Sequence, residues 1–163
     1  MYIIIPAYEP DKRLIQVVQD ITIKLPKARI IVVNDGSGPG YNDYYDETAF
    51  IGATVLTHPI NKGKGAALKT AFAHIQEEVV SQHLSAQTIV TVDSDGQHLI
   101  KDIVRVAKAI EENPSHLVLG ARAFVGKVPA RSRFGNKVTA GLFRLVTGQK
   151  VTDTQTGLRG MST

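Results

Sequence analysis

Short runs of branched apolar residues alternate along this chain with longer segments in which apolar residues recur every three or four positions. Runs of the first kind are typical of strands buried in a sheet that is covered on both faces. They predict strands over residues 2–5, 29–33, 53–57, 88–93 and 116–119. Segments of the second kind predict amphipathic helices over residues 11–24, 43–51, 64–80, 100–112 and 132–147. This alternation predicts an α/β fold, with a mostly parallel, Rossmann-like sheet and helices on both faces.

The most informative polar residues follow the fourth predicted strand, in the sequence TIVTVDSDGQH of residues 88–98. Asp93 and Asp95 fall at the carboxyl end of this strand, where open α/β sheets bind ligands. Oxygen ligands on a tight loop suit Mg²⁺ or Mn²⁺, ions that usually share their coordination shell with substrate phosphates. A turn in which either carboxylate bonds its own backbone before Gly96 is the simpler interpretation. The strand context favours the metal site.

Other loops predicted at the same edge of the sheet carry polar side chains or glycine. Asp35 follows the second strand and is suited to accept hydrogen bonds from a ribose or a base, although Asp-Gly also forms simple turns. Tyr8 and Glu9 follow the first strand, where a ring can cover a base and a carboxylate can take a hydroxyl. Lys64 lies at the start of a helix, a natural anion site, although such lysines are often only exposed loop charges.

Composition limits the class of protein. The chain has 163 residues, 43% of them hydrophobic, so it is long enough for one domain with a sizeable core. No stretch approaches the ~18 apolar residues of a membrane span, and the sequence MYIIIPAYEP lacks the basic flank of a signal peptide. The absence of cysteine excludes a disulfide framework and a thiol nucleophile. We expect residues 1–163 to be a single domain at the front of a longer chain.

The net charge of +4 is unevenly distributed. Residues 113–152 contain no acidic residue but seven basic ones: Arg122, Lys127, Arg131, Arg133, Lys137, Arg144 and Lys150. Such a region favours an anionic partner, for example a diphosphate, a lipid phosphate or a membrane surface, and it also fits an ordinary solvated face. Nucleic acid is not expected as a partner, because no aromatic stacking platform accompanies these charges.

Several common sites are not supported. The chain has no P-loop, no G-x-G-x-x-G fingerprint and no G-x-S-x-G elbow. These absences argue against a P-loop protein, a dinucleotide-binding protein and a serine hydrolase. His58, His98 and His116 lack the spacing of a zinc site, although His98 is predicted near the paired aspartates.

Taken in order, the loops resemble those of the family 2 glycosyltransferases of the GT-A fold. The matching segments are IIIPAYE (3–9), VVNDGS (32–37), NKGKGAAL (61–68), VDSDGQH (92–98), GAR (120–122), RSRFGN (131–136) and DTQTGLRG (153–160). The last three are most similar to the branch that makes dolichyl- or polyprenyl-phosphate sugars. The Q-x-x-R-W motif of processive polysaccharide synthases is missing from this sequence.

The resemblance implies a sugar-nucleotide donor, a divalent metal, Mg²⁺ or Mn²⁺, and inversion at the anomeric carbon. The donor-binding residues that it implies are Pro6, Ala7, Tyr8, Glu9, Asp35, Lys64, Asp93, Ser94 and Asp95. The implied metal ligands are Asp93, Asp95 and Gln97. Arg131 and Arg133 would contact an acceptor phosphate, and the implied catalytic residues are Asp95, Arg122 and Asp153.

The expected reaction transfers a hexose from a UDP- or GDP-sugar to polyprenyl phosphate, in cell-envelope biogenesis. A lipid phosphate is already an anion at neutral pH, so no strong general base is needed, whereas a sugar hydroxyl would need one and Asp153 is the candidate. Transfer to a saccharide hydroxyl, in cell-wall or capsule assembly, and a non-catalytic nucleotide-binding module are the alternatives. The expected location is the cytoplasm, at the inner face of the membrane, which the basic 132–147 segment would contact.

Overall fold

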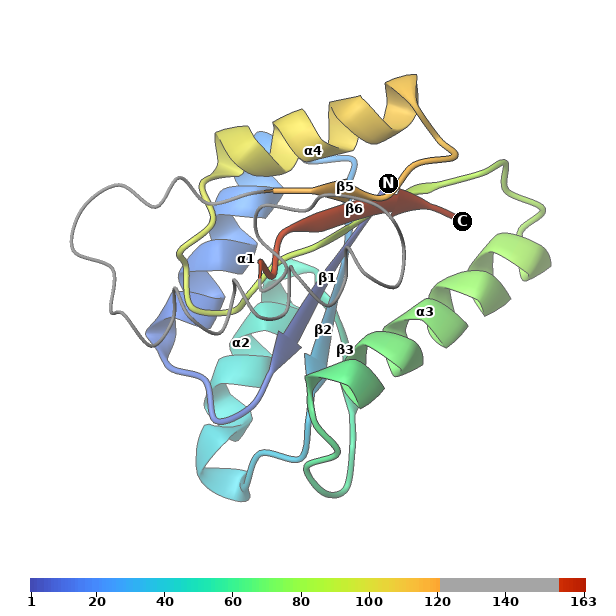
Figure 1. The fold of residues 1–163 in the computed structure, drawn as a ribbon. Helices are drawn as coiled ribbons and strands as arrows, with labels where there is room; N and C mark the ends of the chain where they lie inside the picture. The colour runs from blue at the N-terminus through green and yellow to red at the C-terminus, as the bar shows by residue number, and fades with distance from the viewer. Residues whose placement is uncertain (121–155) are drawn as a thin grey trace, which may run out of the picture.

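A computed structural model describes residues 1–120 and 156–163 of the chain. Figure 1 shows its helices arranged about one central sheet. In chain order the elements are β1 (Tyr2–Ala7), α1 (Lys12–Lys24), β2 (Arg29–Asn34), the 3-10 turn η1 (Pro39–Tyr41), α2 (Asn42–Ile51), β3 (Thr54–Thr57), α3 (Lys64–Ser81), β4 (Thr88–Thr91), α4 (Ile100–Glu112), β5 (Val118–Leu119) and β6 (Arg159–Ser162).

The predicted elements within the described residues are confirmed, with small changes at their ends. The fourth strand ends at Thr91 rather than at residue 93, although Val92 N–H still donates to Ile4 O at 2.9 Å. The fifth strand is reduced to two residues, Val118 and Leu119. The helix predicted over 132–147 lies outside the described residues.

The sheet has six strands in the order β3-β2-β1-β4-β6-β5. β1 pairs in parallel with both β2 and β4, and β2 pairs in parallel with β3, as the alternation of strands and helices predicts. β6 is antiparallel to both of its neighbours, β4 and β5. The sequence analysis assigns no strand to this segment, because RGMS lacks the apolar pattern of a buried strand.

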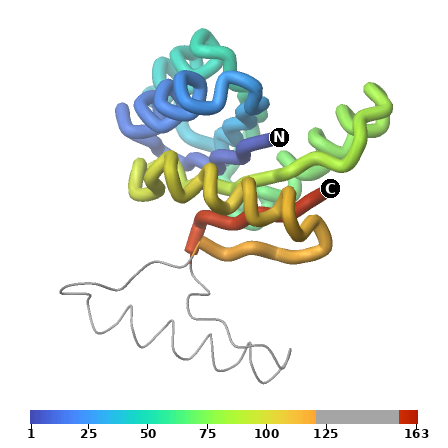
Figure 2. The backbone as a smooth tube through the Cα atoms, turned by 90° about the horizontal axis from the view of Figure 1, so that it is seen from above, coloured from blue at the N-terminus to red at the C-terminus, as the bar shows by residue number. Residues whose placement is uncertain are grey.

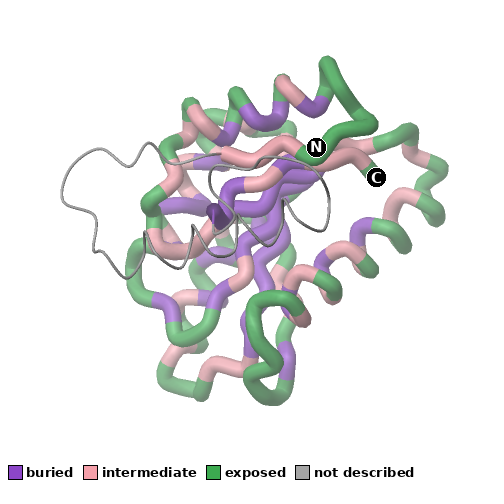
Figure 3. The backbone as a smooth tube through the Cα atoms, in the orientation of Figure 1, coloured by how far each residue is buried: buried purple, intermediate pink, exposed green. Residues whose placement is uncertain are grey.

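The two faces of the sheet are covered by different helices. Along β1, Ile3 and Ile5 belong to a core with α1, α2 and α4, whereas Tyr2 and Ile4 belong to a second core with α3. Alternate residues of a strand point to opposite faces, so a strand between two cores must be apolar throughout. In Figure 3 the buried positions are concentrated in the central strands.

Each helix packs through one apolar face. In α1 the carboxylate of Asp11 accepts a hydrogen bond from Arg13 N–H at 2.9 Å and caps the first turn. Leu14, Val18 and Ile21 are its fully buried positions. No helix in residues 1–120 and 156–163 combines the length and the apolar character needed to cross a membrane.

The first and last residues of the chain meet at Gln87, just before β4. The N-terminal amine donates to the Gln87 side-chain oxygen at 3.1 Å, and Thr163 N–H donates to the Gln87 backbone oxygen at 3.0 Å. Both ends therefore lie close together, as Figures 1 and 2 show from two directions. This is the edge of the sheet opposite to the polar loops described next.

Candidate functional site

The polar loops identified in the sequence gather at the carboxyl edge of the parallel strands. In Figure 1 the arrows of β1 and β2 point toward this edge. The loops after β2 and β3 are held to it by backbone hydrogen bonds, from Asp35 N–H to Ala7 O and from His58 N–H to Asn34 O, both 2.9 Å long. The strand order therefore places Asp35 and the paired aspartates on either side of the end of β1.

Asp35 is buried, with 3% of its surface exposed, and one oxygen of its carboxylate has two polar partners. Oδ1 contacts Nδ1 of His58 at 2.7 Å and accepts a hydrogen bond from Lys62 N–H at 3.0 Å. Burial by itself raises the pKa of the Asp35 carboxyl, but hydrogen bonding by the Lys62 backbone, the His58 ring and the Gly63 backbone together holds that pKa below its usual value. Asp35 is therefore a carboxylate at neutral pH despite its burial.

The loops after β1 and β2 are joined through Ser37. Its hydroxyl accepts a hydrogen bond from Glu9 N–H and contacts the hydroxyl of the buried Tyr45, both at 2.8 Å. Tyr45 in turn donates to Ala7 O at 3.2 Å. Because each partner comes from a different segment, this network holds the end of β1 and the Asp35 loop in one arrangement.

The four residues predicted from the first motif lie at the end of β1. Pro6 and Ala7 are its last two residues, and Ala7 is buried. Tyr8 is 48% exposed, so its ring is accessible to a ligand at the edge of the sheet. A hydrogen bond with the neighbouring Glu9 carboxylate raises the pKa of the Tyr8 hydroxyl. An exposed aromatic ring of this kind can cover a planar group of a ligand.

Asp93 lies between two potential cations. Its Oδ1 forms an ion pair with the Lys64 ammonium, and its Oδ2 lies 3.2 Å from Nε2 of His98. The His98 hydrogen bond and the Lys64 charge hold the pKa of the Asp93 carboxyl far below its usual value, against the opposing effect of partial burial. The predicted proximity of His98 to the paired aspartates is confirmed.

The C-terminal segment closes one side of this carboxylate. A Cβ at Gly157 would lie 1.9 Å from Oδ2 of Asp93, so a larger residue at this position would displace the Asp93 carboxylate. Gly157 belongs to the DTQTGLRG segment, which is remote from Asp93 in the sequence. No local sequence pattern predicts this contact.

Asp95 adopts the turn that the sequence analysis weighs as the simpler interpretation. Its Oδ1 accepts a hydrogen bond from Gln97 N–H at 3.0 Å, and Gly96 has a φ of +75°. Ser94 lies in the same turn, between the two aspartates. This turn also brings both carboxylates to one loop, so it does not exclude the second interpretation.

The donor set can be compared with what a divalent cation requires. Within residues 1–120 and 156–163, no three His, Cys, Asp or Glu side chains converge as a metal site. Two carboxylates on a tight turn nevertheless provide the hard oxygen ligands of Mg²⁺ and Mn²⁺, and Asp93 already lies against a positive charge. The residues fit an ion that takes its remaining ligands from a diphosphate and from water.

Four predicted site residues, Arg122, Arg131, Arg133 and Asp153, lie outside the described residues. His58 also belongs to the site and is not predicted from the sequence. Its position directly after β3, beside the strand that precedes Asp35, was the available signal, because the ends of neighbouring parallel strands adjoin.

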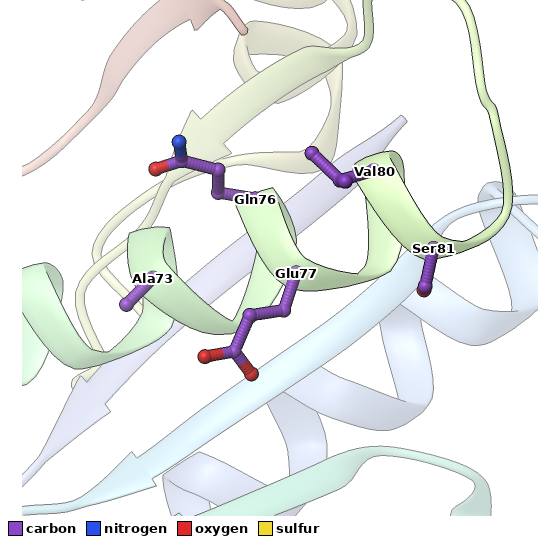
Figure 4. Close-up of a pocket in the computed structure, with 5 residues that line it drawn as sticks. All are labelled: Ala73, Gln76, Glu77, Val80 and Ser81. Carbon is purple, nitrogen blue, oxygen red and sulfur yellow. The ribbon is translucent and has the colours of Figure 1, made fainter.

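A surface hollow elsewhere does not belong to this site. Its described lining residues all lie on the second half of α3: Ala73, Gln76, Glu77, Val80 and Ser81. Figure 4 shows these side chains projecting from the helix surface, with Glu77 as the single ionisable group among them. The site at the carboxyl edge is instead assembled from the polar loops that follow β1, β2, β3 and β4.

Comparison with known proteins places these features in a family. Residues 2–162 match the model of Glycosyl transferase family 2. The chain is 30% identical over 180 residues to the UDP-N-acetylglucosamine–dolichyl-phosphate N-acetylglucosaminyltransferase of Methanococcus voltae, a match that covers 99% of this chain and 69% of the relative. It is 29% identical to an uncharacterized protein of Methanocaldococcus jannaschii, with 99% and 64% covered.

A dolichyl-phosphate beta-glucosyltransferase of Trichomonas vaginalis is 27% identical, with 96% of this chain and 50% of the relative covered. The chain thus spans about half to two thirds of the length of these relatives.

Two solved structures share the fold. A mycobacterial protein aligns with a TM-score of 0.69 at 20% identity, covering 99% of this chain and 52% of the other. The mannosyltransferase PcManGT of Pyrobaculum calidifontis, solved with GDP-Man and Mn²⁺, aligns with a TM-score of 0.53 at 20% identity, covering 72% and 34%. These likenesses confirm the GT-A type of fold predicted from the sequence. Since the family model extends over almost every residue, the chain belongs to glycosyl transferase family 2.

Proposed function

We propose that this chain binds a nucleotide-diphosphate sugar and transfers the sugar to polyprenyl phosphate. The observation that carries the proposal is the placement of Asp35 and the Asp93–Asp95 turn on either side of the end of β1. Neighbouring strands lie about 4.8 Å apart, so the two sites are separated by about 10 Å. This spacing is comparable to the span from the base to the diphosphate of a nucleotide.

The nucleoside is proposed to lie between Asp35 and Tyr8. Asp35 is ionised and buried, so its remaining acceptor capacity favours a hydrogen-bond donor of the base or ribose. Tyr8 is accessible beside it and offers an apolar ring face. Pro6, Ala7 and Glu9 complete the wall formed by the end of β1.

The diphosphate is proposed to lie at the Asp93–Asp95 turn and the start of α3. Lys64 is the first residue of α3, and the N-cap, Gly63, supplies no side-chain hydrogen bond, so this end of the helix is suited to phosphate oxygens. Asp93 and Asp95 would hold Mg²⁺ or Mn²⁺, with Gln97 and Ser94 in the same turn. When bound, this ion would neutralise negative charge on the diphosphate.

The chain's own groups have defined tasks in the transfer step. Lys64 stabilises charge on the diphosphate as its bond to the anomeric carbon breaks. The acceptor oxygen attacks that carbon from the opposite side, which inverts its configuration. A phosphate acceptor is already anionic and loses no proton, so the reaction needs no general base.

The names of the relatives support the choice of acceptor. Those from Methanococcus voltae and Trichomonas vaginalis are named as transferases that act on dolichyl phosphate. A lipid acceptor would bring the reaction to a membrane surface, and the supply of nucleotide sugars in the cytoplasm makes its cytoplasmic face the proposed location.

The proposal is tested with the complete protein, radiolabelled UDP- or GDP-sugar, Mn²⁺ and vesicles that contain polyprenyl phosphate. We expect label to pass from the aqueous phase to the organic phase. A parallel reaction contains a glycan primer in place of the lipid. Label that moves to the glycan alone would contradict the lipid acceptor, whereas donor binding without any transfer would identify a non-catalytic nucleotide-binding module.

A further inference from the structure

His58 is a buried polar residue that the proposed reaction does not use. Only 6% of its surface is exposed, and both ring nitrogens have partners. Nδ1 lies 2.7 Å from Oδ1 of Asp35, and Nε2 lies 2.8 Å from the hydroxyl of Thr70 on α3. A buried imidazole with two short polar contacts has one fixed orientation.

The chain holds this ring from three elements. The His58 backbone N–H continues the pairing of β3 with β2 by donating to Asn34 O at 2.9 Å. Thr70 approaches from α3, which covers one face of the sheet. Asp35 approaches from the end of β2. The orientation of the ring, and with it that of the Asp35 carboxylate, therefore depends on both the sheet edge and α3.

Two of the groups that bind Asp35 contact the same carboxylate oxygen. His58 and Lys62 N–H both contact the same oxygen, Oδ1. A carboxylate held through one oxygen is fixed in its rotation, so the direction of the other oxygen, Oδ2, is fixed as well. The direction of Oδ2 is thus set by the protein before a ligand binds.

We propose that His58 is a positioning residue for nucleoside recognition: it orients Asp35 so that Oδ2 accepts a hydrogen bond from an N–H of the base or an O–H of the ribose. This inference rests on the nucleoside-binding role proposed above for Asp35. It assigns His58 no contact with the substrate and no part in the transfer step. The ligand group recognised through Asp35 is a hydrogen-bond donor on the base or the ribose of a nucleotide.

Two substitutions separate the functions of the two ring nitrogens. In His58→Asn the amide nitrogen occupies about the position of Nδ1 and can still donate to Asp35. In His58→Gln the amide reaches about the position of Nε2, keeps the contact with Thr70 and leaves Asp35 without its side-chain partner. We expect His58→Gln to weaken the binding of UDP or GDP, whichever the wild type binds, by about tenfold, and His58→Asn by less than about threefold.

Inorganic diphosphate with Mn²⁺ is the matched probe for the other end of the site. Its affinity should be the same in the wild type and both His58 variants. If His58 had a purely structural role, its substitution would lower the melting temperature. The loss of affinity would then be the same for nucleotide and diphosphate, and the same in His58→Gln and His58→Asn. Equal losses for both variants, or an equal loss for the diphosphate, would overturn the proposal.

Analogues of the bound nucleotide identify the group that Asp35 recognises. An N-methylated base and a 2′,3′-dideoxyribose each remove one kind of donor. The ratio of wild-type to His58→Gln affinity should fall to about one for the analogue that lacks the recognised group. A ratio that stays near tenfold with both analogues would contradict recognition through Oδ2.

Asp35→Asn distinguishes this inference from the proposed function. If Asp35→Asn leaves nucleotide affinity unchanged, the nucleoside-binding role itself is wrong. If Asp35→Asn weakens binding but His58→Gln does not, only the role of His58 is wrong. Should His58→Gln fail to fold, Thr70→Val tests the same ring orientation, with an expected loss of about threefold for the nucleotide and none for diphosphate; unchanged nucleotide affinity would overturn the proposal.

Discussion

Asp93 is held by two basic side chains at once, Lys64 from the start of α3 and His98 from the loop before α4. The sequence suggests a carboxylate that binds a metal cation, and the structure shows one that is already paired with the Lys64 ammonium and hydrogen-bonded to His98. These two states are compatible if a diphosphate draws Lys64 toward itself as it binds. The ion pair then stabilises the protein without ligand, and its partners rearrange when the ligand enters.

We expect Asp93→Asn to lower the free energy of unfolding by about 1 kcal/mol at pH 7, the size of a partly exposed, hydrogen-bonded ion pair. The folded state lowers the pKa of this carboxyl from its ordinary 3.8. Its stabilising effect is therefore complete above that value and is lost as the pH falls toward the lower, folded-state pKa. Urea denaturation should show a constant difference from wild type above about pH 5 that shrinks toward about pH 2.

Asp46→Asn is the matched control, since Asp46 is exposed on α2, far along the chain from this cluster. It should leave the free energy of unfolding nearly unchanged over the same pH range. A difference between wild type and Asp93→Asn that grows on acidification would show that the ion pair does not stabilise the fold.

Asp95→Ala should abolish the Mn²⁺-dependent part of nucleotide binding. Asp95 is one of only two carboxylates in the turn, so its loss removes half of the charged ligands available to the ion. Titration calorimetry with UDP and GDP, with and without Mn²⁺, measures the effect, and Glu112→Ala at the exposed end of α4 is the control. Unchanged affinity in the presence of Mn²⁺ would argue against a metal at this turn.

At the scale of elements, the loops after β2 and β3 act as one unit. Gly36 has a φ of +75°, and a Cβ there would lie 2.1 Å from the backbone carbon of Ile60. The neighbouring Lys62 N–H donates to Asp35, so the close approach at Gly36 is what brings the two loops into hydrogen-bonding range. α3 then continues from the second loop and supplies both Lys64 and Thr70.

Gly36→Ala should separate these loops. Both the positive φ and the clash oppose a side chain, so we expect a loss of about 2–4 kcal/mol in the free energy of unfolding and weaker nucleotide binding. Gly40→Ala is the control, because a Cβ at Gly40 meets no atom within 4 Å. Chemical denaturation and nucleotide titration of both variants would decide the point. Equal behaviour of the two would mean that the loops are free to move apart.

At the scale of the whole molecule, the segment that leads into β6 packs against the Asp93 loop and bonds to the end of β4. Thr91 donates to Gly157 O at 2.7 Å, and Thr156 donates to Gly120 O at the same distance. The first bond joins β4 to the segment before β6 next to the paired aspartates, and the second joins that segment to the end of β5. The last eight residues therefore contribute to the site without supplying one of its predicted ligands.

Thr91→Val keeps the shape and strand preference of the side chain but leaves the buried Gly157 carbonyl without its donor. We expect a loss of about 1–2 kcal/mol in the free energy of unfolding. Thr88→Val on the same strand is the matched control, with an expected change within about 0.5 kcal/mol. Similar losses for both would show that the connection between β4 and β6 does not depend on this hydrogen bond.

The sequence alone predicts the α/β alternation, the limits of most elements and the edge at which the polar loops meet. Those features depend on local periodicity and on the chirality of strand–helix–strand connections, which can be read along the chain. Asp35, Asp93 and Asp95 are identified in the same way, because each follows a strand of clear pattern. The family follows from the order of the motifs.

The antiparallel strand β6, the contact of Gly157 with Asp93 and the His58–Asp35 pair required the tertiary structure. β6 has no apolar pattern because two of its four residues are Gly160 and Ser162, and it forms a strand through pairing with β4 and β5. The two contacts join residues 64 and 23 positions apart. Such contacts depend on which strand ends become neighbours and on which side chains can approach closely, and local sequence patterns carry neither kind of information.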